Sequence, residues 1–205
     1  NASIDISGDR NIGGLLGHFK QGIINDSKVT GSVFSSDDNV GGLVGQMRIS
    51  DVHYSVSEVD VESSNGRSRY SNYRVGGVIG FQYGGEIFRS YSNGDVGMNY
   101  EPEKVGGLVG ESEGGKIKQS FSTGSIGDEH SLEVGGLVGE QIGGKIANSY
   151  STSRVYSDDV DGSAGIVGKS DSGSIKNSYT NSKSNINGVL GRGSGAQVTG
   201  SYSRY

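Results

Sequence analysis

The chain has 205 residues, a net charge of −5 and 38 glycines, yet only 31% of its residues are hydrophobic and it contains no cysteine. The absence of cysteine excludes disulfides and thiolate metal sites, and the acidic balance argues against nucleic acid as a partner. No apolar run reaches the roughly 18 residues that a membrane-spanning helix needs. With so little apolar content, the chain is either disordered or a thin repetitive structure that buries small side chains in layers.

A glycine-rich motif recurs along the chain and divides it into repeats. It reads VGGLVG at residues 40–45, 105–110 and 134–139, and VGGVIG at residues 75–80. The copies begin, in chain order, at Ile12, Val40, Val75, Val105, Val134, Ser163 and Ile186. Their spacings are 28, 35, 30, 29, 29 and 23 residues, and the variation falls in the last part of each repeat. Each repeat is therefore a rigid unit followed by a corner of variable length.

Three further positions keep a constant distance from the motif. Twelve residues after its first residue, every copy has a β-branched aliphatic residue: Ile24, Val52, Ile87, Ile117, Ile146, Ile175 and Val198. Fifteen residues after it, every copy has serine: Ser27, Ser55, Ser90, Ser120, Ser149, Ser178 and Ser201. The next residue is aromatic in the last five copies: Tyr91, Phe121, Tyr150, Tyr179 and Tyr202. A disordered chain has no reason to preserve these positions, so we reject the disordered class.

The composition of the repeat favours strands over helices, because glycine pairs, β-branched residues and serine runs are poor helix formers. Three short segments look like strands, of the types VGGLVG, GGKIANSYS and GSI, each bounded by turn residues. We predict that residues 1–205 form a single all-β domain, a parallel β-solenoid of about seven coils, each with roughly 29 residues and three short strands. The variable corners are longest at residues 62–74 and 97–104.

The recurring residues have structural interpretations. The motif glycines need either a positive φ or a close backbone approach at a tight corner. We expect the serines, such as Ser90, Ser120, Ser149 and Ser178, to form a ladder of hydrogen bonds between coils, because no histidine recurs beside them to act as a base. We expect Tyr91, Phe121, Tyr150 and Tyr179 to stack into an aromatic ladder, although such a column can also bind sugars or bases.

Neither the carboxylates nor the acidic turns of the sequence indicate a catalytic or metal site. Glu111 and Glu140 occupy the same position of neighbouring repeats, followed by Lys169 and Arg192, and this pattern is typical of a charged surface. The segment SDDVDG, residues 157–162, lacks the full pattern of a calcium loop and is typical of a turn. We therefore predict no enzyme activity, no cofactor and no metal.

The long corner at residues 62–74 is the best candidate for recognition, because loops on a rigid scaffold carry binding residues. It combines arginine and tyrosine, which suit contact with a glycan or a protein: Arg67, Arg69, Tyr70, Tyr73 and Arg74.

The two ends of the chain fall at nearly the same position of the repeat, and neither has a polar capping segment. An uncapped solenoid end exposes strand edges that pair with further strands. We therefore expect either further repeats of the same polypeptide or head-to-tail stacking of subunits.

The motif VGGLVG followed by GGKIANSYS resembles the GLUG repeat of bacterial surface and secreted proteins, among them IgA-specific metallopeptidases and filamentous-haemagglutinin-like adhesins. The resemblance is clearest over residues 74–161, and the copies that begin Ser163-Ala164 and Ile186-Asn187 depart from it. The HExxH zinc signature of the peptidases is absent, so the resemblance implies no protease activity. It implies an extracellular or cell-surface stalk, scaffold or adhesive subunit, with host or surface glycans or proteins as partners. The alternative is a solenoid that binds or cleaves carbohydrate.

Overall fold

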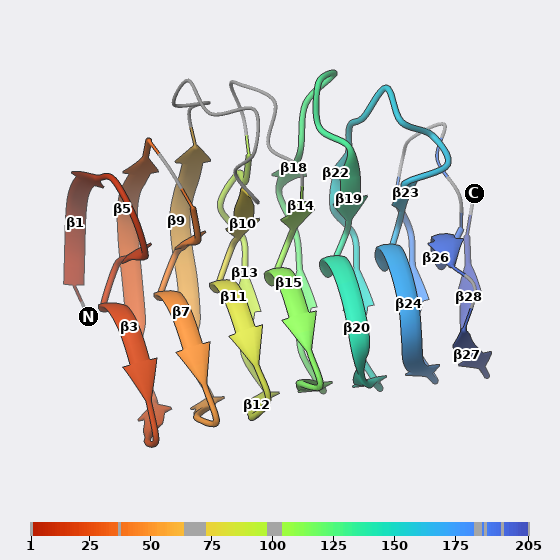
Figure 1. Ribbon diagram of the computed structural model, residues 1–205, viewed down its shortest axis with the longest axis horizontal. Helices are drawn as coiled ribbons and strands as arrows, with labels where there is room; N and C mark the ends of the chain where they lie inside the picture. Colours follow the sequence, from red (N-terminus) through yellow and green to blue (C-terminus); the bar gives the residue numbers. More distant parts are fainter. Residues whose placement is uncertain are drawn as a thin grey trace.

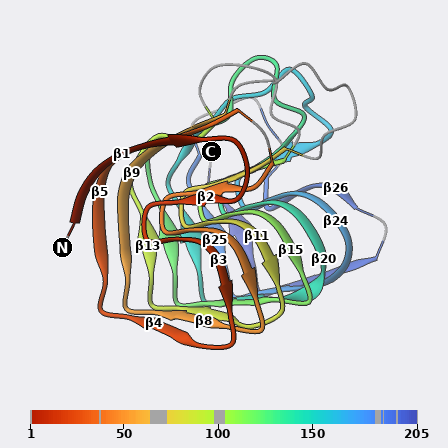
Figure 2. The same cartoon turned by 60° about the vertical axis from the view of Figure 1, so that its left-hand side comes forward.

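The computed structural model describes residues 2–36, 38–63, 73–97, 104–182, 186, 188–193 and 195–204. Within these residues the chain is all-β and forms a parallel β-solenoid of about six turns, close to the seven coils predicted (Figures 1 and 2). Each turn adds one strand to each face of the stack. The solenoid prediction is therefore confirmed.

Three main sheets form the faces of the solenoid. The eight-stranded sheet contains β1 (Ala2–Gly8), β5 (Lys28–Ser35), β9 (Val56–Ser63), β13 (Tyr91–Ser92), β17 (Phe121–Ser122), β21 (Tyr150–Ser151), β25 (Tyr179–Thr180) and β28 (Tyr202–Ser203). The six-stranded sheet contains β2 (Ile12–Gly13), β6 (Val40–Gly41), β10 (Arg74–Gly76), β14 (Lys104–Gly106), β19 (Glu133–Gly135) and β23 (Ser163–Ala164).

The twelve-stranded sheet has two parts in each coil. Its first part contains β3 (Leu16–Lys20), β7 (Val44–Arg48), β11 (Ile79–Tyr83), β15 (Val109–Glu113) and β26 (Leu190–Gly193). Its second part contains β4 (Ile23–Asn25), β8 (Asp51–His53), β12 (Glu86–Phe88), β16 (Lys116–Lys118) and β27 (Ala196–Thr199). Two long strands run through both parts, β20 (Val138–Ala147) and β24 (Val167–Lys176), and a separate pair is formed by β18 (Ser125–Ile126) and β22 (Arg154–Val155).

The strand register shows that each repeat makes one complete coil. Val105 of β14 pairs with Val75 of β10 on one side and with Val134 of β19 on the other. Ile117 of β16 likewise lies between Ile87 and Ile146. Equivalent residues of successive repeats are therefore stacked directly on one another, as the spacing of the motif predicted.

The core is a set of aliphatic columns that run along the solenoid. In the coil that begins at Val105, the inward residues Val105, Leu108, Val109, Ile117 and Ile126 are all buried. Each contacts the same type of residue in the coils above and below, so a few side chains per coil are enough to exclude water. This arrangement accounts for the low hydrophobic content of the sequence.

The glycine motif divides at a corner between two sheets, so the coils that begin at Ile12, Val40 and Val75 each have four strand segments in place of the three predicted. In the fourth copy, β14 ends at Gly106 and β15 begins at Val109. None of the glycines in the four VGG motifs has a positive φ. A Cβ at Gly107 would instead overlap the carbonyl oxygen of Gly136 in the next coil and lie 2.6 Å from Ser122 Oγ. Close approach of neighbouring coils is therefore the reason for glycine here.

A second corner lets both the aliphatic and the serine columns point inward. The residue fourteen positions after the start of the motif has a left-handed backbone in every coil: Asp26, Tyr54, Arg89, Gln119, Asn148, Asn177 and Gly200. At Asn148, for example, φ is 52°. This conformation interrupts the alternation of the strand, so that Ile146 and Ser149 are both buried although they are three residues apart. Strict alternation along a strand would place only one of these two side chains inside.

The variable corners within the described residues lie along one side of the solenoid (Figure 2). Figure 2 shows them at the top, opposite the second part of the twelve-stranded sheet, where β4 and β8 lie. The structure describes two of these corners, residues 127–132 and 156–162. Most of the predicted corners at 62–74 and 97–104 lies outside the described residues.

Candidate functional site

The serine column forms a continuous ladder inside the corner that follows the left-handed residue. The backbone N–H of Ser90 donates to Ser120 Oγ at 3.2 Å, and that of Ser120 donates to Ser149 Oγ at 3.3 Å. The pattern continues from Ser149 to Ser178 at 3.3 Å. Each hydroxyl in turn donates to the carbonyl two residues earlier, as Ser120 does to Lys118 at 2.8 Å. These hydroxyls are buried and fully engaged, so none is placed to act as a nucleophile.

The aromatic column forms a stack on the outer side of the eight-stranded sheet. The ring centroids of Tyr91 and Phe121 are 4.6 Å apart, those of Phe121 and Tyr150 are 4.8 Å apart, and those of Tyr150 and Tyr179 are 5.0 Å apart. The planes differ by 8° or less. Each inner ring has both faces covered by its neighbours, so only its edge is open to a ligand.

A shallow polar depression lies beside the aromatic stack. It is lined by Gly124, Ser125, Thr152, Arg154 and Asn181, which come from successive coils at the end of the eight-stranded sheet. Hydroxyl, amide and guanidinium groups are those that hydrogen-bond to sugar hydroxyls.

The residues predicted for recognition at 62–74 divide into two groups. Arg67, Arg69 and Tyr70 lie outside the described residues. Tyr73 is only 4% exposed, so its ring packs within the molecule. Arg74 lies at the base of this corner and makes an ion pair instead of projecting into solvent. The recognition role of this corner stays a prediction.

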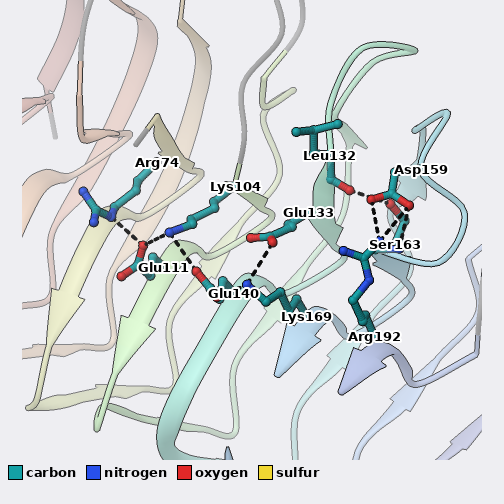
Figure 3. Close-up of polar contacts among 11 residues, drawn as sticks. Arg74, Lys104, Glu111, Leu132, Glu133, Glu140, Asp159, Ser163, Lys169 and Arg192 are labelled. Carbon is teal, nitrogen blue, oxygen red and sulfur yellow. Dashed lines mark hydrogen bonds and ion pairs between the residues drawn. The ribbon is translucent and has the colours of Figure 1, made fainter. Parts of the chain in front are cut away.

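A chain of ion pairs runs along the corner between the six-stranded and twelve-stranded sheets (Figure 3). Arg74 Nε lies 2.7 Å from Glu111 Oε2 of the next coil. Lys104 Nζ lies between two carboxylates, 2.5 Å from Glu111 and 2.7 Å from Glu140. The guanidinium of Arg74 also covers the ring of Phe81 at 4.5 Å. Glu111 and Glu140 are only 2% and 3% exposed, so the sequence prediction of a charged surface here was wrong.

The chain continues through Lys169. Its Nζ lies 2.6 Å from Glu140 and 3.1 Å from Glu133. The six residues contribute three positive and three negative charges: Arg74, Lys104, Lys169, Glu111, Glu133 and Glu140. We call these six residues the charge chain.

The pKa values of Glu111 and Glu133 are shifted in opposite directions. Burial by itself would raise the pKa of Glu111, but hydrogen bonds from Arg74 and Lys104 hold it below its ordinary value. Burial and the neighbouring Glu140 raise the pKa of Glu133, because Lys169 only partly offsets them. Its Oε2 atom is buried and has no hydrogen-bond partner among the described residues.

The two ammonium groups of the charge chain stay protonated. Burial would lower the pKa of Lys104, but its hydrogen bonds to Glu111 and Glu140 outweigh this effect and raise it. The hydrogen bond to Glu140 raises the pKa of Lys169 well above its ordinary value. A carboxylate that performs acid–base chemistry on a sugar must reach its substrate. The closed contacts around Glu111 and Glu140 therefore support cohesion of the coils and not catalysis.

The acidic turn at residues 157–162 is used for internal contacts. Asp159 accepts a hydrogen bond from the N–H of Gly162 at 3.1 Å, and its Oδ2 lies 3.1 Å from Arg192 (Figure 3). Within the part of the chain that the structure describes, no three histidine or acidic side chains are grouped so as to hold a metal ion. The same part contains no helix that is long and apolar enough to cross a membrane.

Two segments of the chain, residues 71–97 and 130–156, match the GLUG motif. The chain carries GLUG repeats. These segments contain the third and fifth copies of the glycine motif, and the resemblance inferred from the sequence is confirmed there. No curated protein matches the chain, and no solved structure matches it.

The charge chain of the GLUG coils has a signal that sequence reasoning missed. Arg74, Lys104 and Glu133 each precede the first valine of a motif by one residue. Phe81, Glu111 and Glu140 lie seven residues further on, in the strand that follows the first corner. A comparison of these two columns would have paired Lys104 with Glu111. Either column by itself resembles a row of solvated charges.

Proposed function

We propose that this GLUG solenoid is an extracellular structural and adhesive rod, a stalk, scaffold or fibre subunit of a bacterial surface or secreted protein. The observation that carries the proposal is the parallel register of the glycine-motif strands, in which equivalent residues pair from coil to coil. The serine ladder, the aromatic stack and the charge chain all join one coil to the next. They stiffen the stack along its axis, as a spacer requires.

Catalysis is not part of this proposal. The serines of the ladder are buried and donate to backbone carbonyls. Glu111 and Glu140 share Lys104 and are hidden from solvent. To test this point, the chain is incubated with acidic and neutral polysaccharides and new reducing ends or unsaturated products are measured. Turnover that Glu111→Gln abolishes would establish the carbohydrate-cleaving alternative.

Exposed leucines in the first described coil also support the proposal that further coils stack on this end of the solenoid. Leu15 and Leu16 are 37% and 38% exposed, whereas Leu43 and Val44, the equivalent residues of the next coil, are fully buried. An additional coil of the same kind, from the same polypeptide or from a second copy, would cover these side chains. Light scattering over a dilution series should show concentration-dependent association of this chain. The variant Leu15→Glu/Leu16→Glu should weaken it.

The surface role is tested on the cells that produce the chain. Intact cells are treated with protease and probed with an antibody against the solenoid, with a cytoplasmic protein as control. Loss of the signal without loss of the control is the expected result. Small-angle scattering of the purified chain should give an elongated particle. A signal that survives until the cells are lysed would contradict the extracellular role.

A further inference from the structure

Four lysines gather on the outer side of the second part of the twelve-stranded sheet. Lys116 and Lys118 belong to β16, Lys145 to β20 and Lys176 to β24. Lys116 is in direct register with Lys145, and Lys118 and Lys176 are in register with Ala147 between them. Neighbouring strands are about 4.8 Å apart, so the four side chains cover three adjacent coils. We call this set the lysine face.

The lysine face is not required by the fold. The position of Lys116 and Lys145 is occupied in the other coils by unrelated side chains: Ile23, Asp51, Glu86, Ser174 and Gln197. Like charges in direct register on neighbouring strands repel each other and destabilise the sheet. Two lysines stacked on one another are therefore an unfavourable choice for stability.

Most of the positive charge of the lysine face is not neutralised within the molecule. Lys118 pairs with Glu86 at 2.6 Å. Lys116, Lys145 and Lys176 take part in no ion pair with the described residues. Elsewhere, the partly buried lysines of the charge chain each contact two carboxylates. The chain thus keeps cations unpaired on one flat face although its net charge is −5.

Three exposed acids lie on the other side of the solenoid: Glu129, Asp158 and Asp161 belong to the variable corners at residues 127–132 and 156–162, which Figure 2 places opposite the second part of the twelve-stranded sheet. Glu86 is in register with Lys116 on the face of the lysines itself, but residues 116–118, 145–147 and 174–176 of the three lysine-bearing coils contain no acid. A negatively charged partner is therefore favoured at these three coils over the corners.

We infer that the lysine face binds an acidic polysaccharide, with carboxylates or sulfates of successive sugar units contacting lysines of successive coils. The inference rests on the proposed adhesive role and names the partner. A flat, regular array of point charges suits a repeating polymer of regularly spaced anions. Single-stranded nucleic acid is the less suitable polyanion, because it also requires aromatic faces on which bases stack. The ring in register with Lys118 is Phe88, which packs edge-on against His53 and Tyr54 and is covered by Arg89 at 5.0 Å. It does not provide the row of open ring faces on which successive bases stack.

The test measures binding of the purified chain to four immobilised polymers: heparin, polygalacturonate, dextran and single-stranded DNA. The chain should bind heparin and polygalacturonate, and binding should weaken as salt is raised. It should not bind dextran. The variant Lys116→Gln/Lys145→Gln/Lys176→Gln should bind the acidic polysaccharides about tenfold more weakly, because three charge contacts are lost.

A matched variant separates the lysine face from net charge. Lys20→Gln/Arg48→Gln/Arg204→Gln also removes three exposed positive charges, but from other parts of the surface. Its affinity should change less than about twofold. Equal weakening in both variants would show that net charge alone matters, and equal binding to DNA and polygalacturonate would show that the site does not select polysaccharide. Either result overturns the inference.

The stability of the lysine variant provides a second readout. Its thermal midpoint should equal or exceed that of the wild type, because the repulsion between Lys116 and Lys145 is removed. A variant that is both less stable and weaker in binding would indicate that the lysines are structural, which contradicts the inference. If the lysine variant binds as tightly as the wild type, the lysine face is not the binding site. The proposed scaffold would be unaffected, because scattering and cell-surface labelling test it independently.

Discussion

Replacement of Gly107 by alanine tests why the motif contains glycine. Gly107 has an ordinary φ, so the backbone itself tolerates alanine. A Cβ at this position would overlap the carbonyl oxygen of Gly136 and lie 2.6 Å from both Cβ and Oγ of Ser122. Ser122 already donates a hydrogen bond to the same carbonyl, so neither neighbour is free to move away. The two coils must therefore separate.

The size of the destabilisation follows from the hydrogen bonds that are weakened when the two coils separate. Gly107 N–H donates to Gly135 at 3.2 Å, and Leu108 N–H donates to Leu137 at 2.9 Å. Weakening both bonds costs about 1 kcal/mol each, and overpacking adds about 1–3 kcal/mol. We expect Gly107→Ala to lower the free energy of unfolding by about 3–5 kcal/mol. For a chain of this size, the thermal midpoint should fall by roughly 10 °C.

The control is Gly114→Ala, seven residues away in the same coil. Gly114 has a φ of 68°, and a Cβ there would have no atom within 4 Å. The left-handed backbone disfavours alanine by about 1 kcal/mol, but the unfolded chain also loses entropy, so the net change should stay below about 1 kcal/mol. Urea unfolding followed by circular dichroism measures both variants. If Gly107→Ala is no less stable than Gly114→Ala, close approach of the coils is not the reason for the motif.

Three further predictions concern the charge chain and a strained corner. Glu111→Gln should lower the free energy of unfolding at pH 7 by about 3 kcal/mol, because two cations lose a buried partner, whereas Glu129→Gln at the surface should change it little. The pKa of Glu111 lies below its ordinary value of 4.5, so its stabilisation is present above that pH and is lost as the pH falls through the lowered pKa. The difference between wild type and Glu111→Gln should therefore shrink in acid, and a constant difference between pH 7 and pH 3 would contradict the ion-pair explanation. Ile49 has a φ of 45° and the same 63% exposure as Ile23, which lies in a regular strand, so Ile49→Gly should be about 1–2 kcal/mol less destabilising than Ile23→Gly in urea unfolding.

The sequence by itself determined the coil, its length and its stacking. Strict recurrence of an aliphatic residue and a serine at fixed distances from the glycine motif requires each repeat to return to the same place, and Val105 does lie between Val75 and Val134. This pattern of residues is local and occurs in every copy of the repeat, so each copy supports the prediction independently. The resemblance to the GLUG repeat rests on the same recurring residues.

The tertiary structure decided where the corners lie and which charges meet. The bend at Asn148 depends on one backbone angle, and the same position is filled by tyrosine at Tyr54 and by arginine at Arg89, so residue type does not reveal it. Lys104 contacts Glu111 of its own coil and Glu140 of the next because two sheets meet at their shared corner. Whether a carboxylate is buried depends on the residues that cover it. Here these residues belong to neighbouring coils, and the sequence alone does not give the distance between one coil and the next.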